Sequence, residues 1–327
     1  MKSHLTKSAV AAALVLAVGA ACANDYTAPM KAKKYAEVEK MATAKLALEP
    51  GNAEAMVAKV DAILAAGSEA RIEETIKLAE QCIAVNPVSA ICHLAQGNAL
   101  GSKAMAGGMM SAMSYAGKIR DAYKKAVELD PRNLEARFSL LQFYTMAPSF
   151  MGGGTSKAES LVAQTAAINP EAGKLMAASI DAAEGRVAKA EAAAAAAHPG
   201  ADQELQDRHE SLYGAIAGKY MSDKKYADGE RVVRDGLKRY SDSDSLPYLL
   251  ARTQQGQGKH REAVALFEQV WSKNPGAHVQ YRMGQSLQAL GEKPRAMAAY
   301  EKALAFKPAL NKKMRADAED QVKALKG

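Results

Sequence analysis

The sequence predicts an all-α protein built as a superhelical solenoid of about seven to eight antiparallel helix pairs. Three observations lead to this prediction. A pattern of small and large apolar residues recurs at intervals of about 33 or 34 residues near the C-terminus. Prolines that end helices recur through the N-terminal half. Aromatic residues make up only 6% of the 327 residues, and the many alanines favour closely packed helices over a β-sandwich.

The first residues are typical of an export signal. Lys2 and Lys7 form a positive head, and residues 10–19 supply a short apolar core that is followed by the small-x-small cleavage site Ala-Cys-Ala at 21–23. The apolar stretch is too short to span a membrane. We therefore expect residues 1–23 to be a signal peptide and the mature chain to start near Asn24, in the periplasm of a Gram-negative source.

An alternative makes Cys22 the lipidated first residue of an outer-membrane lipoprotein. Bacterial lipoprotein signals usually carry Leu three places before that cysteine, and Gly19 stands there instead. This difference favours simple secretion. No later stretch is long and apolar enough to cross a bilayer, so no transmembrane segment is expected in the mature chain.

Residues 24–200 are predicted to form irregular helical repeats with two insertions. Their helices are expected to end at Pro50, Pro87, Pro131 and Pro170, because proline disfavours helix in the residue before it. The separations between these prolines are 37, 44 and 39 residues. Each separation is the basic repeat unit plus a small insertion.

Residues 201–327 are predicted to form regular repeats closed by a C-terminal capping helix. One unit carries small residues and one large residue at fixed places, and the unit before it repeats the pattern about 33 residues earlier. The matched positions are Gly284 with Ala251, Ala296 with Ala263, Tyr300 with Phe267, and Ala303 with Val270. Charged residues after position 311 would give the last helix the polar outer face that a terminal repeat needs.

These residues resemble the tetratricopeptide repeat (TPR) family, whose unit is an antiparallel helix pair. On this resemblance, small residues such as Gly284 and Ala296 let the two helices approach closely. Large residues such as Tyr300 and Phe267 fill the space between neighbouring pairs. The resemblance covers most of the mature chain and implies a TPR-like superhelix that binds a protein or peptide partner.

In this family the inner face of the superhelix comes from the first helix of each pair. The positions of this chain that would face the groove are Phe138, Gln142, Tyr248, Arg252, Tyr281 and Gln285. Tyr and Arg are good anchors because they bury a large area and keep a polar tip. Some family members clamp a peptide carboxylate with a lysine, but aromatic residues stand in its place here. We therefore expect no specificity for a C-terminal carboxylate.

Two segments depart from the period. Residues 101–117 hold Met109 and Met113 among four methionines, a residue type often used at promiscuous binding surfaces. The plainer interpretation is two lengthened helices that pack on each other. Residues 147–154 hold Phe150 and Met151 before three glycines.

This glycine-rich loop precedes Ser156 and Glu159, which fit a capping box at the start of a helix. A glycine-rich loop before a helix can bind an anion, although the phosphate-loop pattern is absent and a structural loop is favoured. The segment also resembles a loop of periplasmic helical-repeat proteins such as the T-component of TRAP transporters. That likeness implies small-ligand delivery as an alternative function.

Cys82 and Cys92 lie five residues on either side of Pro87 and are the only cysteines expected in the mature chain. Helices that turn at Pro87 would bring the two thiols face to face. An oxidising compartment favours a disulfide between them, and two buried thiols are the alternative.

No catalytic, metal or cofactor signature was found. The six histidines form no His-x-x-x-His pair and join no cysteine at zinc spacing, and no Gly-x-Ser-x-Gly elbow occurs. The net charge is +7, but the basic residues alternate with acidic ones and form no dense stripe, so nucleic-acid binding is not expected. The sequence thus predicts a non-catalytic scaffold without a cofactor, and a periplasmic small-molecule or lipid-binding transporter accessory component is the alternative.

Overall fold

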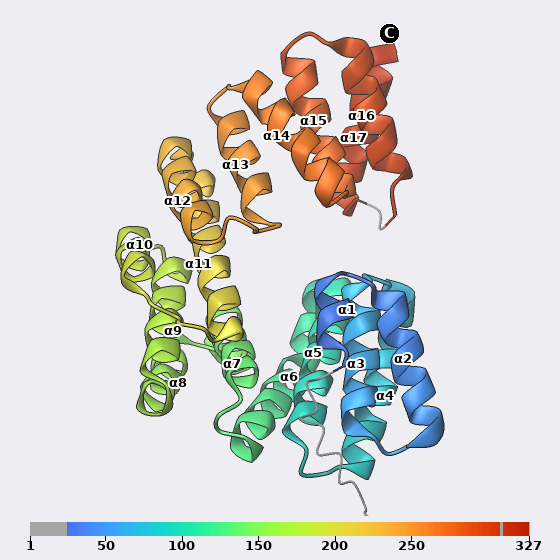
Figure 1. Ribbon diagram of the computed structural model, residues 1–327, viewed down its shortest axis with the longest axis vertical. Helices are drawn as coiled ribbons and strands as arrows, with labels where there is room; N and C mark the ends of the chain where they lie inside the picture. The colour runs from blue at the N-terminus through green and yellow to red at the C-terminus, as the bar shows by residue number, and fades with distance from the viewer. Residues whose placement is uncertain (1–24, 308–309, 327) are drawn as a thin grey trace, which may run out of the picture.

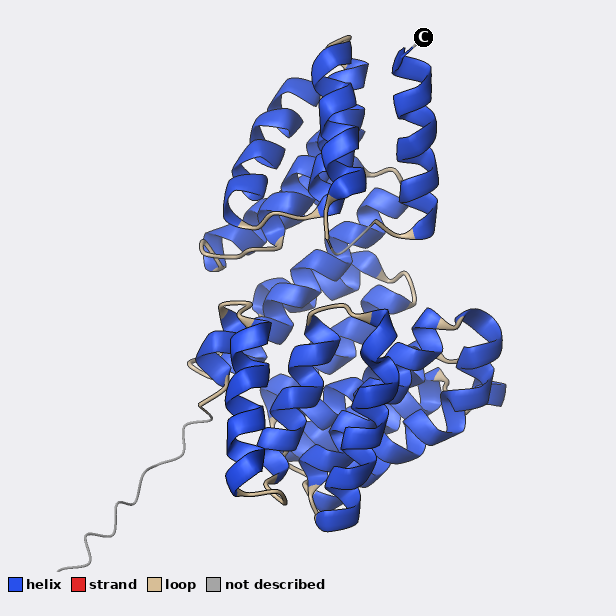
Figure 2. Cartoon of the chain, turned by 90° about the vertical axis from the view of Figure 1, so that its right-hand side faces the viewer, coloured by secondary structure: helices blue, strands red, loops and turns tan. Residues whose placement is uncertain are grey.

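The structure, a computed structural model, describes residues 25–307 and 310–326. Within these residues the chain forms α-helices, two short 3-10 helices and no strand (Figures 1 and 2). The all-α class is therefore confirmed. The expected signal peptide and Cys22 lie outside the described residues, and their assignment stays a prediction.

The helices follow one another with short connections, as the tight turns of a helical-repeat protein require. They are α1 (Thr27–Lys31), α2 (Tyr35–Leu48), α3 (Ala53–Ala65), α4 (Ile72–Val85), α5 (Ala90–Ala106), α6 (Gly108–Leu129), α7 (Leu134–Met146), α8 (Thr155–Ile168), α9 (Pro170–Ala183), α10 (Val187–Ala196), α11 (Gln203–Ser222), α12 (Tyr226–Arg239), α13 (Leu246–Gly256), α14 (His260–Lys273), α15 (Ala277–Ala289), α16 (Lys293–Ala305) and α17 (Lys312–Lys326). The 3-10 helices are η1 (Glu69–Arg71) and η2 (Ser149–Met151).

Each helix packs on the next one along the chain, and first helices of neighbouring pairs also touch, as α3 does with α5 and α11 with α13. This pattern defines a solenoid, in which a repeat packs mainly on its neighbours. Seven complete pairs run from α3 and α4 to α15 and α16. The single turn of α1 and the helix α2 form an incomplete first pair, and α17 closes the stack. The predicted superhelix of about seven to eight units is confirmed.

Small residues allow the helices of a pair to approach closely. A Cβ added to Gly284 in α15 would lie 2.9 Å from the ring of Tyr300 in α16. Between neighbouring pairs, a Cβ on Gly256 in α13 would lie 2.3 Å from the ring of Tyr226 in α12. Tyr300 and Phe267 are fully buried. The close approach at Gly284 is thus confirmed, whereas the filling of the space between pairs by Tyr300 and Phe267 stays a prediction.

Polar side chains fix the start of several first helices. Asn52, Asn133 and Asn169 each accept a hydrogen bond from the backbone N–H three residues later, as N-cap residues do. The expected capping box of Ser156 and Glu159 is wrong. Helix α8 begins at Thr155, two residues too early for Ser156 to cap it; its N-cap is Gly154, and no side-chain cap bond forms.

The solenoid curves so far that its two halves meet. Figure 1 shows an open C in which α7 to α12 form the back and the helices α1 to α6 and α13 to α17 form the arms. Lys33, in the turn before α2, makes an ion pair of 2.7 Å with Asp244, which precedes α13. Both side chains are exposed, so this contact marks the closeness of the arms and adds little stability.

Candidate functional site

A hollow of about 420 Å³ crosses the first helices of three consecutive pairs in the C-terminal half. Helix α11 contributes its last turn to the wall, α13 its second half and α15 its middle, and the first residues of α12 and α14 close one side. The side chains that line it are Met221, Ser222, Tyr226, Arg252, Gln255, His260, Arg282 and Gln285, with the backbone of Gly218 and Gly256. The hollow thus lies on the face that the repeat pattern assigns to the groove.

A missing side chain opens this hollow. Gly218 of α11 stands 34 residues before Arg252, which in turn stands 33 residues before Gln285, so the three occupy the same place in successive repeats. Arg252 and Gln285 project long side chains from this place, whereas a Cβ built on Gly218 would meet nothing within 4 Å. The sequence therefore leaves room beside an arginine on the inner face.

The hollow carries positive charge without acidic neighbours. Two arginines and one histidine line it, and no Asp or Glu does. Burial, followed by the nearby charge of Arg282, lowers the pKa of Arg252. The Nε of Arg282 and the Nδ1 of His260 are buried without a hydrogen-bond partner among the described residues. The Nε–H of Arg282 is therefore a donor without an internal partner, and the Nδ1 of His260 can donate or accept according to its tautomer.

A chain of hydrogen bonds holds one side of the hollow in place. Arg282 donates to the Oε1 of Gln285 at 3.1 Å, and the amide of Gln285 donates to the hydroxyl of Tyr281 at 2.9 Å. That hydroxyl donates in turn to Asp317 of α17 at 2.7 Å. On the opposite side, Gln255 of α13 donates to the backbone carbonyl of Arg282 at 2.8 Å.

The structure brings together only part of the predicted C-terminal groove set. Arg252 and Gln285 line the hollow. Tyr248 is half-buried, with its ring 5.9 Å from that of Phe267, and Arg252 lies over its face at 5.9 Å. Tyr281 is buried, and the internal bond to α17 uses its hydroxyl.

Phe138 and Gln142 lie on α7, away from this hollow. Phe138 is buried beneath the guanidinium of Arg208, which lies 4.8 Å from the ring centroid, whereas Gln142 is exposed. A second hollow of about 300 Å³ lies between α1, α3, α5 and α7. Its acidic residues include Asp61, whose pKa is raised to about 7 by burial and by the charge of Glu135.

The segment 101–117 forms no separate loop. It continues α5 and α6 as lengthened helices that pack along each other and turn at Gly107 and Gly108, which confirms the plainer of the two interpretations. The four methionines at this tip are exposed by half or more of their surface: Met105, Met109, Met110 and Met113. They therefore face solvent instead of an enclosed cavity.

The glycine-rich loop is held by its own backbone. The amides of Gly152, Gly153 and Gly154 donate to the carbonyls of Ser149, Pro148 and Tyr144. Gly152 and Gly154 have positive φ values of 96° and 117°, which favour glycine. Since these amides are already used, the loop fits a structural role better than anion binding. Phe150 is exposed, and Met151 is partly buried against the main core.

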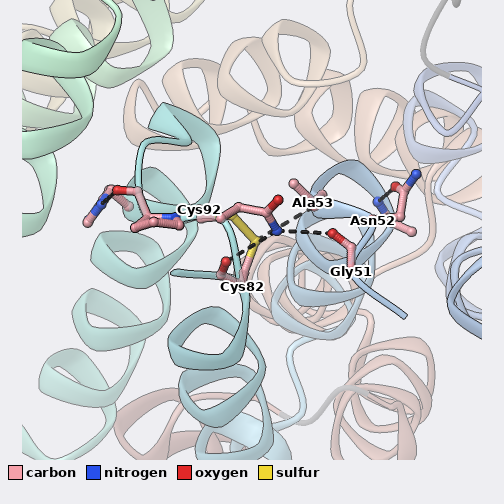
Figure 3. Close-up of a disulfide and its surroundings, with 9 residues drawn as sticks. Gly51, Asn52, Ala53, Cys82 and Cys92 are labelled. Atoms are coloured by element: carbon pink, nitrogen blue, oxygen red, sulfur yellow. Dashed lines mark hydrogen bonds between the residues drawn. A yellow bond between two sulfur atoms is a disulfide. The ribbon is translucent and has the colours of Figure 1, made fainter. Parts of the chain in front are cut away.

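A disulfide joins Cys82, in the last turn of α4, to Cys92, in the first turn of α5, with a Cα–Cα distance of 5.5 Å (Figure 3). Both cysteines are buried against Met56. The side chain of Asn86 donates to the carbonyl of Gly51 at 3.0 Å, so the turn that the disulfide spans is also tied to the preceding helix pair.

The described residues hold neither a candidate metal site nor a candidate membrane span. No group of three or more His, Cys, Asp or Glu side chains lies close enough together to hold a metal ion in residues 25–307 and 310–326. Over the same residues, no helix combines the length and the apolar character that a membrane span needs.

Comparisons with known proteins agree with this architecture. Two family models described as tetratricopeptide repeat match residues 244–277 and 277–310. Among solved structures, the human IFIT1 dimer with PPP-AAAA has a TM-score of 0.50 at 18% identity, over 84% of this chain and 64% of that one. A tetratricopeptide repeat protein from Parabacteroides merdae has a TM-score of 0.46 at 14% identity, over 92% of this chain and 96% of that one. No curated protein matches the sequence.

The fold and the hollow define a class of protein, a solenoid of antiparallel helix pairs with an inner face built from first helices. Both matched segments fall on complete pairs, α13 with α14 and α15 with α16. Residues 244–310 are therefore two tetratricopeptide repeats, in a chain whose fold is a TPR-like solenoid. At 18% identity the likeness to the IFIT1 structure is a likeness of fold.

Sequence reasoning missed Gly218, His260 and Arg282 as parts of the site. A residue-by-residue alignment of the repeats places Gly218 at the position of Arg252. A glycine at a groove position indicates that no side chain fills the space there. The contribution of His260 follows only from the packing of α14 beside α13, which no single-helix pattern specifies.

Proposed function

We propose that this protein is a non-catalytic repeat scaffold that binds a protein or peptide partner on the inner face of its first helices. The hollow across α11, α13 and α15 is the observation that carries the proposal. It is lined by polar side chains whose hydrogen-bonding atoms are partly unused, on the face where successive repeats present side chains side by side. Peptide recognition needs such a concave surface with a few fixed polar groups.

Export to the periplasm is part of the proposal. It is supported by the sequence of residues 1–23 and by the pairing of Cys82 with Cys92, since disulfides persist in oxidising compartments. Lipid anchoring through Cys22 remains the alternative form of the same proposal.

Filling the hollow tests the proposed binding. A phenylalanine in place of Gly218 projects into the hollow from a site where a Cβ meets no other atom. Gly117 of α6 offers a matched control, because it is also a helical glycine whose Cβ would meet nothing within 4 Å. Gly218→Phe should abolish capture of the native partner, and Gly117→Phe should leave it unchanged. Equal capture by both variants would contradict the groove.

A periplasmic small-molecule or lipid-binding accessory component is the second candidate function. The observation that favours it is the exposed apolar tip of α5 and α6, where Met105 and Met110 are about 80% exposed. Phe150, in η2 beside α6, is 78% exposed. Native mass spectrometry of protein purified from its own compartment separates the two functions, because a co-purifying small ligand supports the carrier and its absence supports the scaffold.

A further inference from the structure

We infer that the hollow across α11, α13 and α15 is an oxyanion site, which receives a carboxylate or phosphate group on a side chain of the bound peptide. The inference rests on the proposed use of the inner face for peptide binding and adds the charge of the occupant. Its basis is a pair of arginines, Arg252 and Arg282, that face one hollow without an acidic partner among the described residues.

The two arginines of the hollow differ from several arginines of the neighbouring helices, which form ion pairs on the surface. Arg231 pairs with Glu191, Arg234 with Glu230, and Arg295 with Glu268 at 3.0 Å. These pairs lie on the surface, where solvent already stabilises the charges. Arg252 and Arg282 are only partly exposed and gain less from solvent. These two partly buried guanidinium groups therefore face the hollow without an ion-pair partner among the described residues.

The donors are arranged before any ligand arrives. Gln285 accepts a hydrogen bond from one end of the Arg282 guanidinium. The Nε of Arg282 remains buried and has no partner among the described residues. The Nδ1 of His260 is buried and unpaired in the same wall. A planar guanidinium matches the two oxygens of a carboxylate or a phosphate, and such charge-assisted bonds are about twice as strong as neutral ones.

The cost of holding two positive charges together supports the same conclusion. Burial and the charge of Arg282 both lower the pKa of Arg252, so the surroundings of this guanidinium disfavour its charged form. A bound oxyanion would relieve this repulsion. Gly218 supplies the space that such a group needs, since no side chain stands at its position on α11.

The inner face as a whole favours an acidic peptide side chain over a polyanion. The hollow between α1, α3, α5 and α7, in the N-terminal half of the chain, presents Glu54, Asp61 and Glu135. A continuous polyanion such as RNA would be repelled there, whereas a peptide can place an acidic residue at one hollow and neutral or basic residues at the other. The predicted occupant is therefore a single anionic side chain.

Binding of three labelled peptides of equal length, measured by fluorescence anisotropy, tests the inference. One peptide is rich in glutamate, the second carries phosphoserine at the same places, and the third carries glutamine. We expect the first two to bind at least tenfold more tightly than the third. The tighter of the two acidic peptides identifies the source of the oxyanion as carboxylate or phosphate.

Charge-removing variants show where the binding occurs. Arg252→Gln and Arg282→Gln should each weaken the acidic peptides at least tenfold. Arg261→Gln, which removes an exposed arginine of α14 outside the hollow, should weaken them less than twofold. Equal losses in all three variants, equal binding of the glutamine peptide, or tighter binding of single-stranded RNA would each overturn the oxyanion site.

The Gly218→Phe variant, which fills the hollow, separates the test of the oxyanion site from the test of the proposed peptide-binding function. A peptide that Gly218→Phe excludes, but that binds equally well with and without the arginines, would overturn the oxyanion site and leave the groove in place. Binding of the native partner that Gly218→Phe leaves intact would contradict the groove itself.

Discussion

Reduction of the disulfide between Cys82 and Cys92 should loosen α4 and α5 selectively. The bond closes a loop with a sequence separation of 10 residues, which corresponds to about 2.7 kcal/mol of chain entropy in the unfolded state at 25 °C. Since 1.36 kcal/mol is a factor of ten, we expect local opening of these helices to become about a hundredfold more frequent.

Hydrogen exchange measured by mass spectrometry, with and without a thiol reductant, can resolve this effect along the chain. Exchange should speed up in α4 and α5 and remain unchanged in α15 and α16, because a solenoid repeat packs mainly on its neighbours. The C-terminal repeats thus serve as an internal control in the same sample. A Cys82→Ala/Cys92→Ala variant should reproduce the effect of the reductant without any added reagent.

Two results would refute this reasoning. Alkylation of both cysteines in the folded, unreduced protein would show that the bond does not form. Unchanged exchange in α4 and α5 after complete reduction would show that the bond adds no stability. In the second case the packing of both cysteines against Met56 would be sufficient to hold the turn.

Three further changes should shift the stability measured by urea unfolding. Lys224→Gly should stabilise by about 0.5–1 kcal/mol, because Lys224 has a φ of 59° in the left-handed region; a loss of stability would contradict this. Gly97→Ala should destabilise by about 1–3 kcal/mol, because the new Cβ would lie 2.3 Å from the ring of Tyr123; a neutral effect would show that the ring moves aside. Burial and the charge of Glu135 raise the pKa of Asp61 to about 7 in the folded protein, whereas the carboxyl titrates near about 4 in the unfolded chain. The free energy of unfolding therefore falls as pH rises from about 4 to 7. Asp61→Asn should therefore stabilise by about 1–3 kcal/mol at pH 8 and have little effect at pH 4, and the reverse order would contradict the assignment.

The fold could be predicted from the sequence because repeated local features specify it. Gly284 and Tyr300 interlock within one helix pair, and the same rule acts at each repeat. The lengthened helices α5 and α6 could also be predicted, because no strong helix breaker other than Gly107 and Gly108 interrupts the helical pattern. The start of α8 was misjudged because Gly154, at a φ of 117°, sets the helix boundary by backbone conformation and not by a side-chain cap.

The candidate site was harder to predict because it depends on three repeats at once. Arg252 and Gln285 were found from their place on a first helix. Tyr281 had the same place in the pattern, but its hydroxyl bonds to Asp317, which lies 36 residues away on α17. Periodicity specifies which side of a helix a residue occupies, whereas its exposure depends on what the next repeat places against it.

Site-specific photocrosslinking in the native host tests the central claim most directly. A photoreactive residue at Gln285, which lines the hollow, is compared with one at the exposed position of Arg261 on α14. We predict a discrete protein adduct from position 285 that disappears in the Gly218→Phe background, and none of that size from position 261. The same adduct from both positions, or an adduct at 285 that persists when the hollow is filled, would contradict binding on the inner face.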